Sequence, residues 1–219
     1  ELGDLGEFGL NDRIKKRTRQ QNKSSVLGIG DDAAIIEAGD TFKVVSSDLL
    51  AEGIHFDLSY FPLKHLGYKS VSVNVSDIAA MNAKPEQILV NLALSNRFSV
   101  EAIDEFYEGV QMACEDYKVN LVGGDTSSSS AGLFISVTAI GSVARDKVVK
   151  RRGAAGGDII CATGDLGAAY IGLQVLAREK QVYMVDPSMQ PQLEKYKYIV
   201  GRQLKPVARM DIIHELDEL

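Results

Sequence analysis

The amino-acid sequence predicts an α+β protein, in which a mixed α/β N-terminal domain, residues 1–145, precedes the beginning of a second α/β domain, residues 146–219. Apolar segments with strand-like and helix-like spacing follow one another through the first part and include two main helices. The composition then changes near residue 145, where a glycine-rich basic loop begins. Because the chain starts with Glu1 and ends inside an amphipathic pattern, we expect it to be part of a longer product.

The N-terminal elements begin with a polar, helix-compatible segment at residues 10–20 and a loop at 21–25. The stretch GIGDD, residues 28–32, separates two apolar runs. Glycine permits a positive φ or a close approach, and adjacent aspartates need water or a cation. The stretch is therefore either a turn at a strand end or part of a metal site. Residues 42–48 form the next predicted strand, which places Asp48 at its C-terminal end.

Residues 68–81 fit both a strand alternation and a helical stripe, and the length of the segment favours a helix. Helical spacing places Asn74, Asp77 and Met81 on one face. A strand at 87–94 follows.

Ser99 is the expected N-cap of a second helix. The apolar stripe of this helix consists of Ile103, Phe106, Val110, Ala113 and Tyr117. A short strand at 119–122 leads into Gly-Gly-Asp-Thr, and residues 133–143 form another strand.

The second part of the chain opens with the loop at 151–158. A strand is predicted at 159–162, a turn at 163–165 and a helix at 171–178. Further helical patterns start at Gln192 and Arg209.

The composition restricts the class of partner. A formal net charge of −6 argues against nucleic acid. The chain shows neither a signal segment nor an apolar run of membrane-spanning length, so we expect a cytoplasmic protein without membrane contact. Cys114 and Cys161 lie in apolar contexts without metal-ligand spacing and are expected to be buried free thiols. The basic run 15–17 is expected to be a solvated helix face.

Acidic residues recur after strands, after glycines or within an apolar helix. Each of them alone is commonly a turn former or a solvated residue. Several carboxylates in one cleft without histidine or thiolate partners suit a hard cation such as Mg²⁺. The positions concerned are Asp31, Asp32, Asp48, Asp77 and Asp125.

Six sequence blocks, in this order and at these spacings, resemble the thiamine-monophosphate kinases, and the resemblance covers nearly all of residues 5–210. These kinases belong to a superfamily of ATP-using proteins that includes aminoimidazole ribonucleotide synthetase. The blocks are GIGDDAAII, SSDLLAEGIHFD, YKSVSVNVSDIAAMNAKPEQILVNLALS, LVGGDTSSS, ISVTAIG and RRGAAGGDIICATGDLGAAYIGL.

The resemblance implies Mg²⁺-dependent transfer of a phosphoryl group from ATP to thiamine monophosphate, which gives thiamine diphosphate. It also implies several Mg²⁺ ions and a homodimer in which the sheets of two N-terminal domains join into a barrel. Phosphoryl transfer depends on positioning and charge neutralisation. A phosphate monoester is already a nucleophile near neutral pH, so no catalytic residue beyond the metal ligands is expected.

The resemblance assigns site residues by position. Without it, His55 and Tyr107 would be interpreted as packing residues, whereas an arginine in a glycine-rich loop suits phosphate or a ring. The implied metal ligands are Asp31, Ser46, Ser47, Asp48, Asp77 and Asp125; the implied ATP contacts are Tyr107, Gly124, Asp125 and Arg151; and the implied thiamine-phosphate contact is His55.

Two kinds of alternative stay open. One is another ATP-using reaction of the same superfamily, of the aminoimidazole ribonucleotide synthetase or hydrogenase maturation type. Selenophosphate synthetase is disfavoured because residues 1–30 contain no cysteine. The other is a non-catalytic dimerisation or metal-binding fragment, because the family has a Ser-Asp-Gly block beyond the position that corresponds to Leu219.

Overall fold

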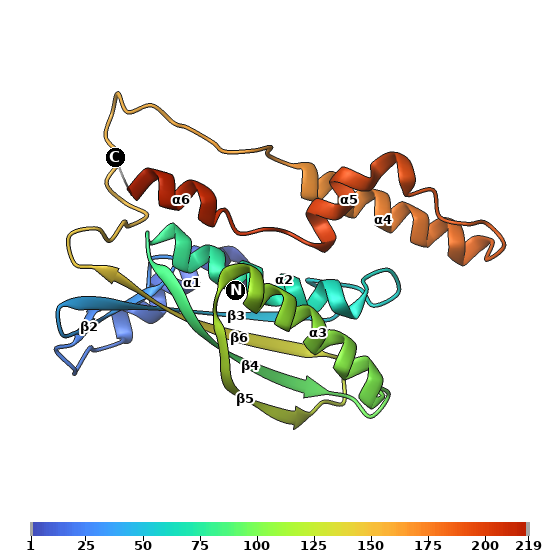
Figure 1. The fold of residues 1–219 in the computed structure, drawn as a ribbon, viewed down its shortest axis with the longest axis horizontal. Coiled ribbons are helices and arrows are strands. Elements are labelled where there is room, and N and C mark those ends of the chain that lie inside the picture. Colours follow the sequence, from blue (N-terminus) through green and yellow to red (C-terminus); the bar gives the residue numbers. More distant parts are fainter. Residues whose placement is uncertain (1, 218–219) are drawn as a thin grey trace.

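The computed structural model describes residues 2–217 and contains one mixed sheet together with α-helices, as the predicted α+β class requires (Figure 1). The strands are β1 (Ser25–Leu27), β2 (Ala34–Ala38), β3 (Thr41–Ala51), β4 (Lys84–Leu94), β5 (Asn120–Ser128) and β6 (Phe134–Ala144). The helices are α1 (Leu2–Arg17), α2 (Leu63–Ala80), α3 (Val100–Tyr117), α4 (Ala168–Val185), α5 (Lys197–Leu204) and α6 (Met210–Asp217).

The sheet has the strand order β1-β2-β3-β6-β4-β5. All neighbouring strands are antiparallel except β4 and β5, which run parallel and are connected through α3. A parallel pair needs such a crossover, whereas antiparallel pairs can be joined by short turns. Strand β6 lies near the centre and pairs with β3 over eleven positions, so β3 and β6 form the central pair of the sheet.

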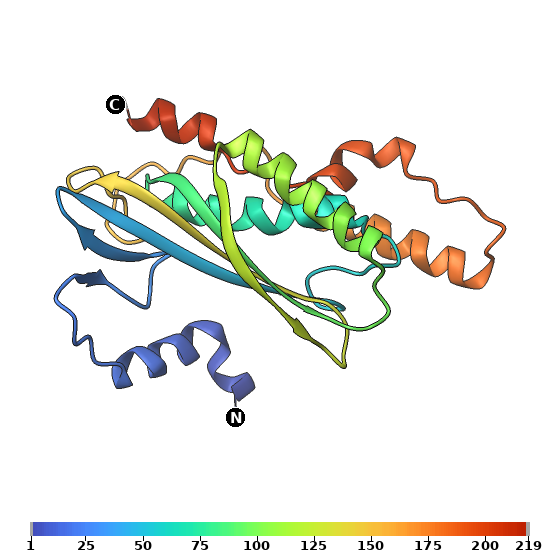
Figure 2. The same ribbon diagram turned by 60° about the horizontal axis from the view of Figure 1, so that its bottom comes forward.

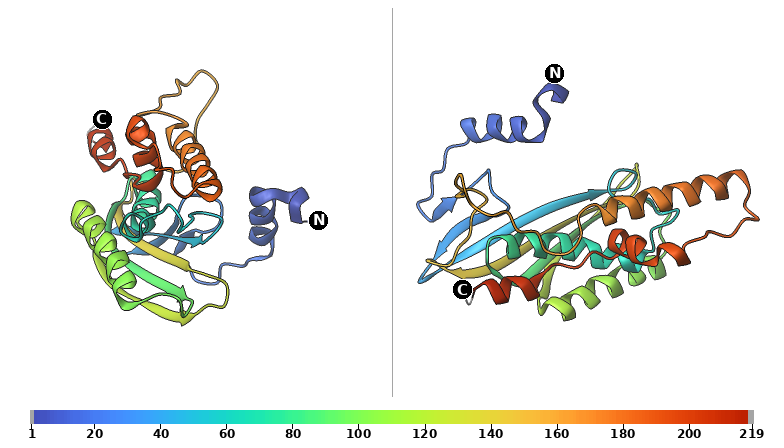
Figure 3. Two further views of the ribbon diagram at one scale, coloured as in Figure 1. Left: turned by 90° about the vertical axis from the view of Figure 1, so that its right-hand side faces the viewer. Right: turned by 90° about the horizontal axis from the view of Figure 1, so that it is seen from above.

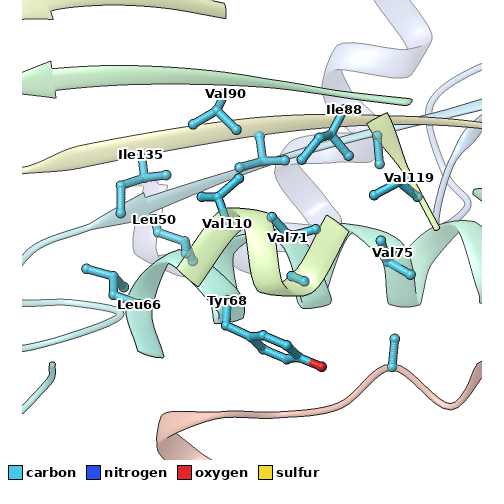
Figure 4. Close-up of a cluster of buried hydrophobic side chains, with 14 of the residues drawn as sticks. Leu50, Leu66, Tyr68, Val71, Val75, Ile88, Val90, Val110, Val119 and Ile135 are labelled. Atoms are coloured by element: carbon cyan, nitrogen blue, oxygen red, sulfur yellow. The ribbon is translucent and has the colours of Figure 1, made fainter. Parts of the chain in front are cut away.

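The hydrophobic core lies between the sheet and the two helices α2 and α3 (Figure 4). On β6, Ile135, Val137 and Ala139 are at most 1% exposed, whereas the residues between them are half-buried. This alternation is typical of a sheet with one face on the core. Helices α2 and α3 cover that face and leave the opposite face of β3 open, where Leu49 is 58% exposed.

The ambiguous segment at 68–81 is helical, as its length predicts, and forms most of α2. The predicted cap of the second helix is also confirmed, because Ser99 Oγ accepts a hydrogen bond of 3.3 Å from the amide of Ala102. On α3, Phe106, Val110 and Ala113 are buried, as the apolar stripe requires.

Two predicted strand ends are wrong. Strand β3 continues past Asp48 to Ala51, and β5 continues through Gly-Gly-Asp-Thr to Ser128. In both cases a neighbouring strand supplies hydrogen-bond partners along the whole segment, β6 for β3 and β4 for β5. Backbone pairing thus extends the strands through polar residues that favour turns when considered alone.

The strand predicted at 159–162 is absent, and the segment is irregular. Ile159 is 88% exposed and Ile160 is 97% exposed. No strand of the described residues pairs with this segment, and a strand without a partner leaves its backbone groups to water. The prediction of two buried thiols is correspondingly half wrong, because Cys114 is buried and Cys161 is exposed.

Helices α5 and α6 contact α2, and the chain between them also contacts the end of α3. Helices α4 and α5 pack against each other, and the chain between α5 and α6 crosses α2 (Figure 3). There, Ser72 Oγ donates to the carbonyl of Pro206 at 2.9 Å, and the amide of Ala208 donates to the Tyr117 hydroxyl at 2.9 Å. Helix α1 lies apart from the other helices (Figure 2). Among the described residues, no helix is long and apolar enough to cross a membrane.

Candidate functional site

The first group of predicted site residues lies where α2 crosses β3. Ser46 is 6% exposed, and its hydroxyl donates to Asp77 Oδ2 at 2.6 Å. One turn earlier on α2, buried Asn74 accepts from the amide of Asp48 at 3.0 Å, and its Nδ2 donates to the carbonyl of Ser70 at 2.9 Å. The spacing of three between Asn74 and Asp77 directs both side chains at β3. The helix and the strand therefore fix the carboxylate of Asp77 and the backbone of Asp48.

The GIGDD turn adds the carboxylates of Asp31 and Asp32, and the loop after β6 adds one cation, Arg151. Arg151 donates through its backbone amide to Asp31 Oδ1 at 3.1 Å and through Nη2 to Asp32 Oδ1 at 2.5 Å. These contacts join the turn between β1 and β2 to the loop after β6. We call Asp31, Asp32, Ser46, Asp48, Asn74, Asp77 and Arg151 the acidic cluster.

The acidic cluster carries more negative charge than its single arginine balances. Burial raises the pKa of Asp77, and the carboxylates of Asp48 and Asp32 raise it further, while the Ser46 hydrogen bond and Arg151 act in the opposite direction. Burial also raises the pKa of Asp48, and Glu7 adds to this effect against the charge of His55. A bound cation would remove both the repulsion and the pKa shift. The cluster therefore has the oxygen donors and the excess charge that suit a hard cation.

His55 lies in the turn after β3 and is exposed. Its Nδ1 accepts from the amide of Ala51 at 3.0 Å. A neutral ring with this hydrogen bond carries its proton on Nε2, which can donate to a ligand. The structure thus places the predicted substrate contact beside Asp48, at the edge of the acidic cluster.

The second group of predicted residues lines a hollow at the edge strand β5. Tyr107 of α3 meets Gly124 and Asp125 of β5 there. Gly124 has a φ of +155°, and a Cβ at this position would lie 1.8 Å from the carbonyl oxygen of Val90. Glycine is therefore required where β5 passes β4. We call this site the β5 hollow; its lining is Val90, Tyr107, Leu121, Gly123, Gly124, Asp125 and Thr126.

The acidic cluster and the β5 hollow are separate. Across the sheet Asp48 pairs with Val137, Val137 with Val90, and Val90 with Gly124. Three strand spacings of about 4.8 Å each place the backbones of Asp48 and Gly124 about 14 Å apart. Within residues 2–217, no three acidic, histidine or cysteine side chains lie close enough together to hold a metal ion by themselves. Asp125 is thus separated from Asp48 by the width of three strands, and among the described residues the other predicted acidic ligands form no such group of three either.

Ser47 is also outside the acidic cluster. Its side chain points to the opposite face of β3 from Ser46, and its hydroxyl lies 3.0 Å from Thr138 Oγ1. Arg151, predicted to contact ATP, lies in the acidic cluster rather than in the β5 hollow.

Sequence reasoning assigned no role to Asn74 and named Asp32 among the acidic positions without making it a ligand; the structure places both in the acidic cluster. The available signals were the spacing of three before Asp77 and the doubled aspartate of GIGDD. The glycines of GIGDD also have a contact that the sequence did not reveal. A Cβ on Gly30 would lie 2.8 Å from Lys15 Nζ, and one on Gly28 would lie 2.7 Å from Gln20 Nε2. The space over this turn is used by side chains from the end of α1 and the loop after it.

The fold and the acidic cluster define a class: an α+β protein with a mixed sheet covered on one face and a cluster of acidic side chains where a helix crosses the sheet. Residues 30–143 match the family described as "AIR synthase related protein, N-terminal domain", so the chain belongs to the AIR synthase related family.

Two curated relatives are similar over nearly the whole chain, and both are thiamine-monophosphate kinases. The protein from Aquifex aeolicus is 38% identical over 218 residues, which are 99% of this chain and 65% of that protein. The protein from Bacillus subtilis is 34% identical over 209 residues, 95% of this chain and 62% of that protein. The resemblance to thiamine-monophosphate kinases is therefore confirmed, and the chain spans less than two thirds of the length of these relatives.

Solved structures agree with this similarity. AaThiL complexed with AMPPCP and TMP matches with a TM-score of 0.83 and 37% identity, over 100% of this chain and 64% of that one. Thiamine monophosphate kinase from Aquifex aeolicus matches with a TM-score of 0.76 and 33% identity, over 98% of this chain and 65% of that one.

Proposed function

We propose that this protein is a thiamine-monophosphate kinase, which transfers the terminal phosphoryl group of ATP to thiamine monophosphate. The observation that carries the proposal is the excess negative charge of the acidic cluster, where burial and neighbouring carboxylates raise the pKa values of Asp48 and Asp77. The similarity to thiamine-monophosphate kinases over 99% of the chain supports it, as does the relative that is complexed with AMPPCP and TMP.

The predicted residues would act at two sites, the acidic cluster and the β5 hollow. Asp31, Asp48 and Asp77 would hold Mg²⁺ ions, and the Ser46 hydroxyl orients Asp77 through its 2.6 Å hydrogen bond. The ions would supply charge neutralisation for the phosphate groups. His55 can donate from Nε2 to the acceptor. Arg151 keeps Asp31 and Asp32 in place and presents a guanidinium that can turn to phosphate.

ATP would extend between the two sites, with its base end at Tyr107 and Gly124 and its phosphates toward the acidic cluster. Asp125 adds a carboxylate on the way. Ser47 is the predicted ligand with the least geometric support, because its hydroxyl contacts Thr138 on the open face of the sheet.

The open face of the sheet would pair with a second copy to form a barrel, which would cover Leu49 at 58% exposure and Val122 at 57% exposure. Residues 1–145 would be the metal-binding, ATP-binding and dimerisation domain. Residues 146–219 would begin a second domain, in which the exposed Ile159 and Ile160 would find strand partners. The two free thiols support a cytoplasmic location.

The test is an end-point assay of the polypeptide with ATP, Mg²⁺ and thiamine monophosphate, in which thiamine diphosphate is measured by chromatography. We expect product with Mg²⁺ and none with EDTA. If no product forms, the same assay on a protein of the relatives' full length decides the matter. Lack of product there would refute the kinase and favour another ATP-using reaction of the superfamily.

A further inference from the structure

The connection between β3 and α2, residues 52–62, carries His55, and we call it the His55 turn. Its backbone is folded back at the start, where the amide of His55 donates to the carbonyl of Ala51 at 2.9 Å. Two aromatic side chains anchor it to the core: Phe56 is 4% exposed and Phe61 is 3% exposed, and their rings meet edge to face with centroids 6.5 Å apart. His55 itself stays exposed beside these anchors.

The carboxylate of Asp57, two residues after His55, uses both of its oxygens. Oδ1 accepts from the amide of Ser59 at 2.9 Å and from its hydroxyl at 2.7 Å, and Oδ2 accepts from Lys180 Nζ at 2.5 Å. Burial alone would raise the pKa of Asp57, but the hydrogen bonds from Lys180 and Ser59 outweigh it and hold this pKa below its usual range. Asp57 is therefore an ionised carboxylate that ties the His55 turn to a residue far along the chain.

Lys180 comes from α4, in the C-terminal part of the chain. Leu176, one turn earlier on the same face of α4, is 2% exposed and belongs to the hydrophobic core. This face of α4 thus points at the first part of the molecule, and Lys180 reaches the His55 turn from it (Figure 3). Within residues 2–217, no other ion pair joins α4 to residues 1–145. The placement of α4 and that of the His55 turn are therefore linked by one charged contact.

We propose that Lys180 is a positioning residue, which acts through Asp57 to hold the His55 turn so that Nε2 of His55 is directed at the acceptor phosphate. The inference rests on the proposed function, which supplies the acceptor, thiamine monophosphate. The hydrogen bond from the amide of Ala51 to His55 Nδ1 keeps the proton of the neutral ring on Nε2, and it requires the turn in this conformation. A donor that is already oriented binds its ligand without the cost of ordering a loop.

The first test is the steady-state kinetics of Lys180→Met. The variant should fold, because an ion pair whose two side chains are each 31% exposed contributes little to stability. We expect the KM for thiamine monophosphate to rise about tenfold, the value of one hydrogen bond to a charged group. The kcat and the KM for ATP should stay within about twofold, because the lost contact is made equally in the ground state and the transition state.

Two further variants are matched to this one. Lys180→Arg keeps the charge and the donor, and it should restore most of the affinity for thiamine monophosphate. Lys195→Met removes the same charge from an exposed position just before α5, and it should behave like the unmodified protein.

The second test reads the position of His55 without turnover. Nitrogen-15 NMR of the imidazole, at a pH at which the ring is neutral, distinguishes the proton on Nε2 from the proton on Nδ1. The unmodified protein and Lys180→Arg should show the Nε2–H form alone, whereas Lys180→Met should show a mixture of both forms. The chain has three histidines, so the signal of His55 is assigned by its loss in His55→Gln.

An unchanged His55 signal in Lys180→Met would overturn the proposal. An unchanged KM for thiamine monophosphate would also overturn it, as would an equal loss of kcat and of affinity for ATP. The two tests together distinguish this inference from the proposed function. Product formation with an unaffected Lys180→Met variant refutes the positioning role alone. A His55 signal that depends on Lys180, in a protein of the relatives' full length that forms no thiamine diphosphate, refutes the proposed function alone.

Discussion

The acidic cluster and the β5 hollow are stabilised in different ways. Hydrogen bonds from side chains position the acidic cluster, whereas the path of the backbone determines the shape of the β5 hollow. Ser46 and Asn74 are at most 6% exposed, and they fix Asp77 and the backbone of Asp48 by hydrogen bonds of 2.6 and 3.0 Å. In the β5 hollow Asp125 is exposed, and the shape depends on the close approach of Gly124 to β4. The cluster should therefore be sensitive to changes of charge and hydrogen bonding, and the hollow to any added side-chain atom.

The largest effect is expected from Asp77→Asn, which removes a charge from the acidic cluster and keeps the shape of the side chain. We expect kcat to fall at least about a hundredfold, because a ligand of the Mg²⁺ that would neutralise the transferring phosphate is lost. The free energy of unfolding should not decrease, because a half-buried carboxylate with a raised pKa is removed. Asp104→Asn, on the exposed side of α3, is the control for activity. Undiminished turnover of the Asp77 variant would contradict the metal-site assignment.

The β5 hollow should respond most strongly to Gly124→Ala. The new Cβ would lie 1.8 Å from the Val90 carbonyl oxygen, so β5 must move away from β4. We expect destabilisation by about 2–3 kcal/mol or more, measured by urea unfolding. Gly123→Ala is a matched control, because the nearest atom to its Cβ would be Leu89 Cδ2 at an ordinary 3.8 Å. Equal stabilities of the two variants would show that the backbone approach is not required.

A smaller effect is expected from Ser46→Ala, which removes the hydrogen bond to Asp77. Positioning groups around metal ligands commonly contribute 10- to 100-fold to metal affinity, so we expect a loss of about tenfold for Mg²⁺ in a calorimetric titration. Ser47→Ala is the control on the opposite face of β3, because the Ser47 hydroxyl contacts Thr138 and not Asp77. An equal loss in the Ser47 variant would show that both serines serve the metal.

The smallest effect is a pH dependence of stability. The pKa values of Asp48 and Asp77 are raised in the folded state, so the folded state binds more protons than the unfolded state above the ordinary pKa of 3.8. Without Mg²⁺, the free energy of unfolding contributed by these groups is highest below that pKa and decreases as the pH rises through the raised values. Urea unfolding at several pH values should show this decrease, and saturating Mg²⁺ should abolish it. A rise in stability over the same pH interval would show that the pKa values of Asp48 and Asp77 are not raised in the folded state.

The comparison also shows which parts of the site could be predicted from sequence. Asp77 and Asn74 were placed on one helix face because a spacing of three has a definite direction on a helix. Asp48 and Ser46 were assigned correctly to one strand, but the end of that strand was wrong, because β6 continues to pair with β3 as far as Ala51. The separation of Asp125 from Asp48 follows from the strand order, which depends on contacts between distant segments.

The segment with Ile159 and Ile160 shows the opposite error, in which the sequence predicts a strand that the structure lacks. Its apolar, β-branched residues favour a strand, yet a strand exists only where another strand accepts its hydrogen bonds, and the described residues provide none. Cys161 is exposed for the same reason, although its neighbours resemble those of buried Cys114.

The sequence by itself determined the α+β class, the helices α2 and α3, the cap at Ser99 and the resemblance that identified the family, because periodicity, capping and motif spacing are properties of neighbouring residues. Only the tertiary structure decided that Arg151 binds Asp31 and Asp32, that Ser47 faces away from Ser46's partner Asp77, and that Lys15 lies over Gly30. These contacts join segments up to 120 residues apart. They depend on the strand order and on the packing of whole elements, which local patterns do not encode.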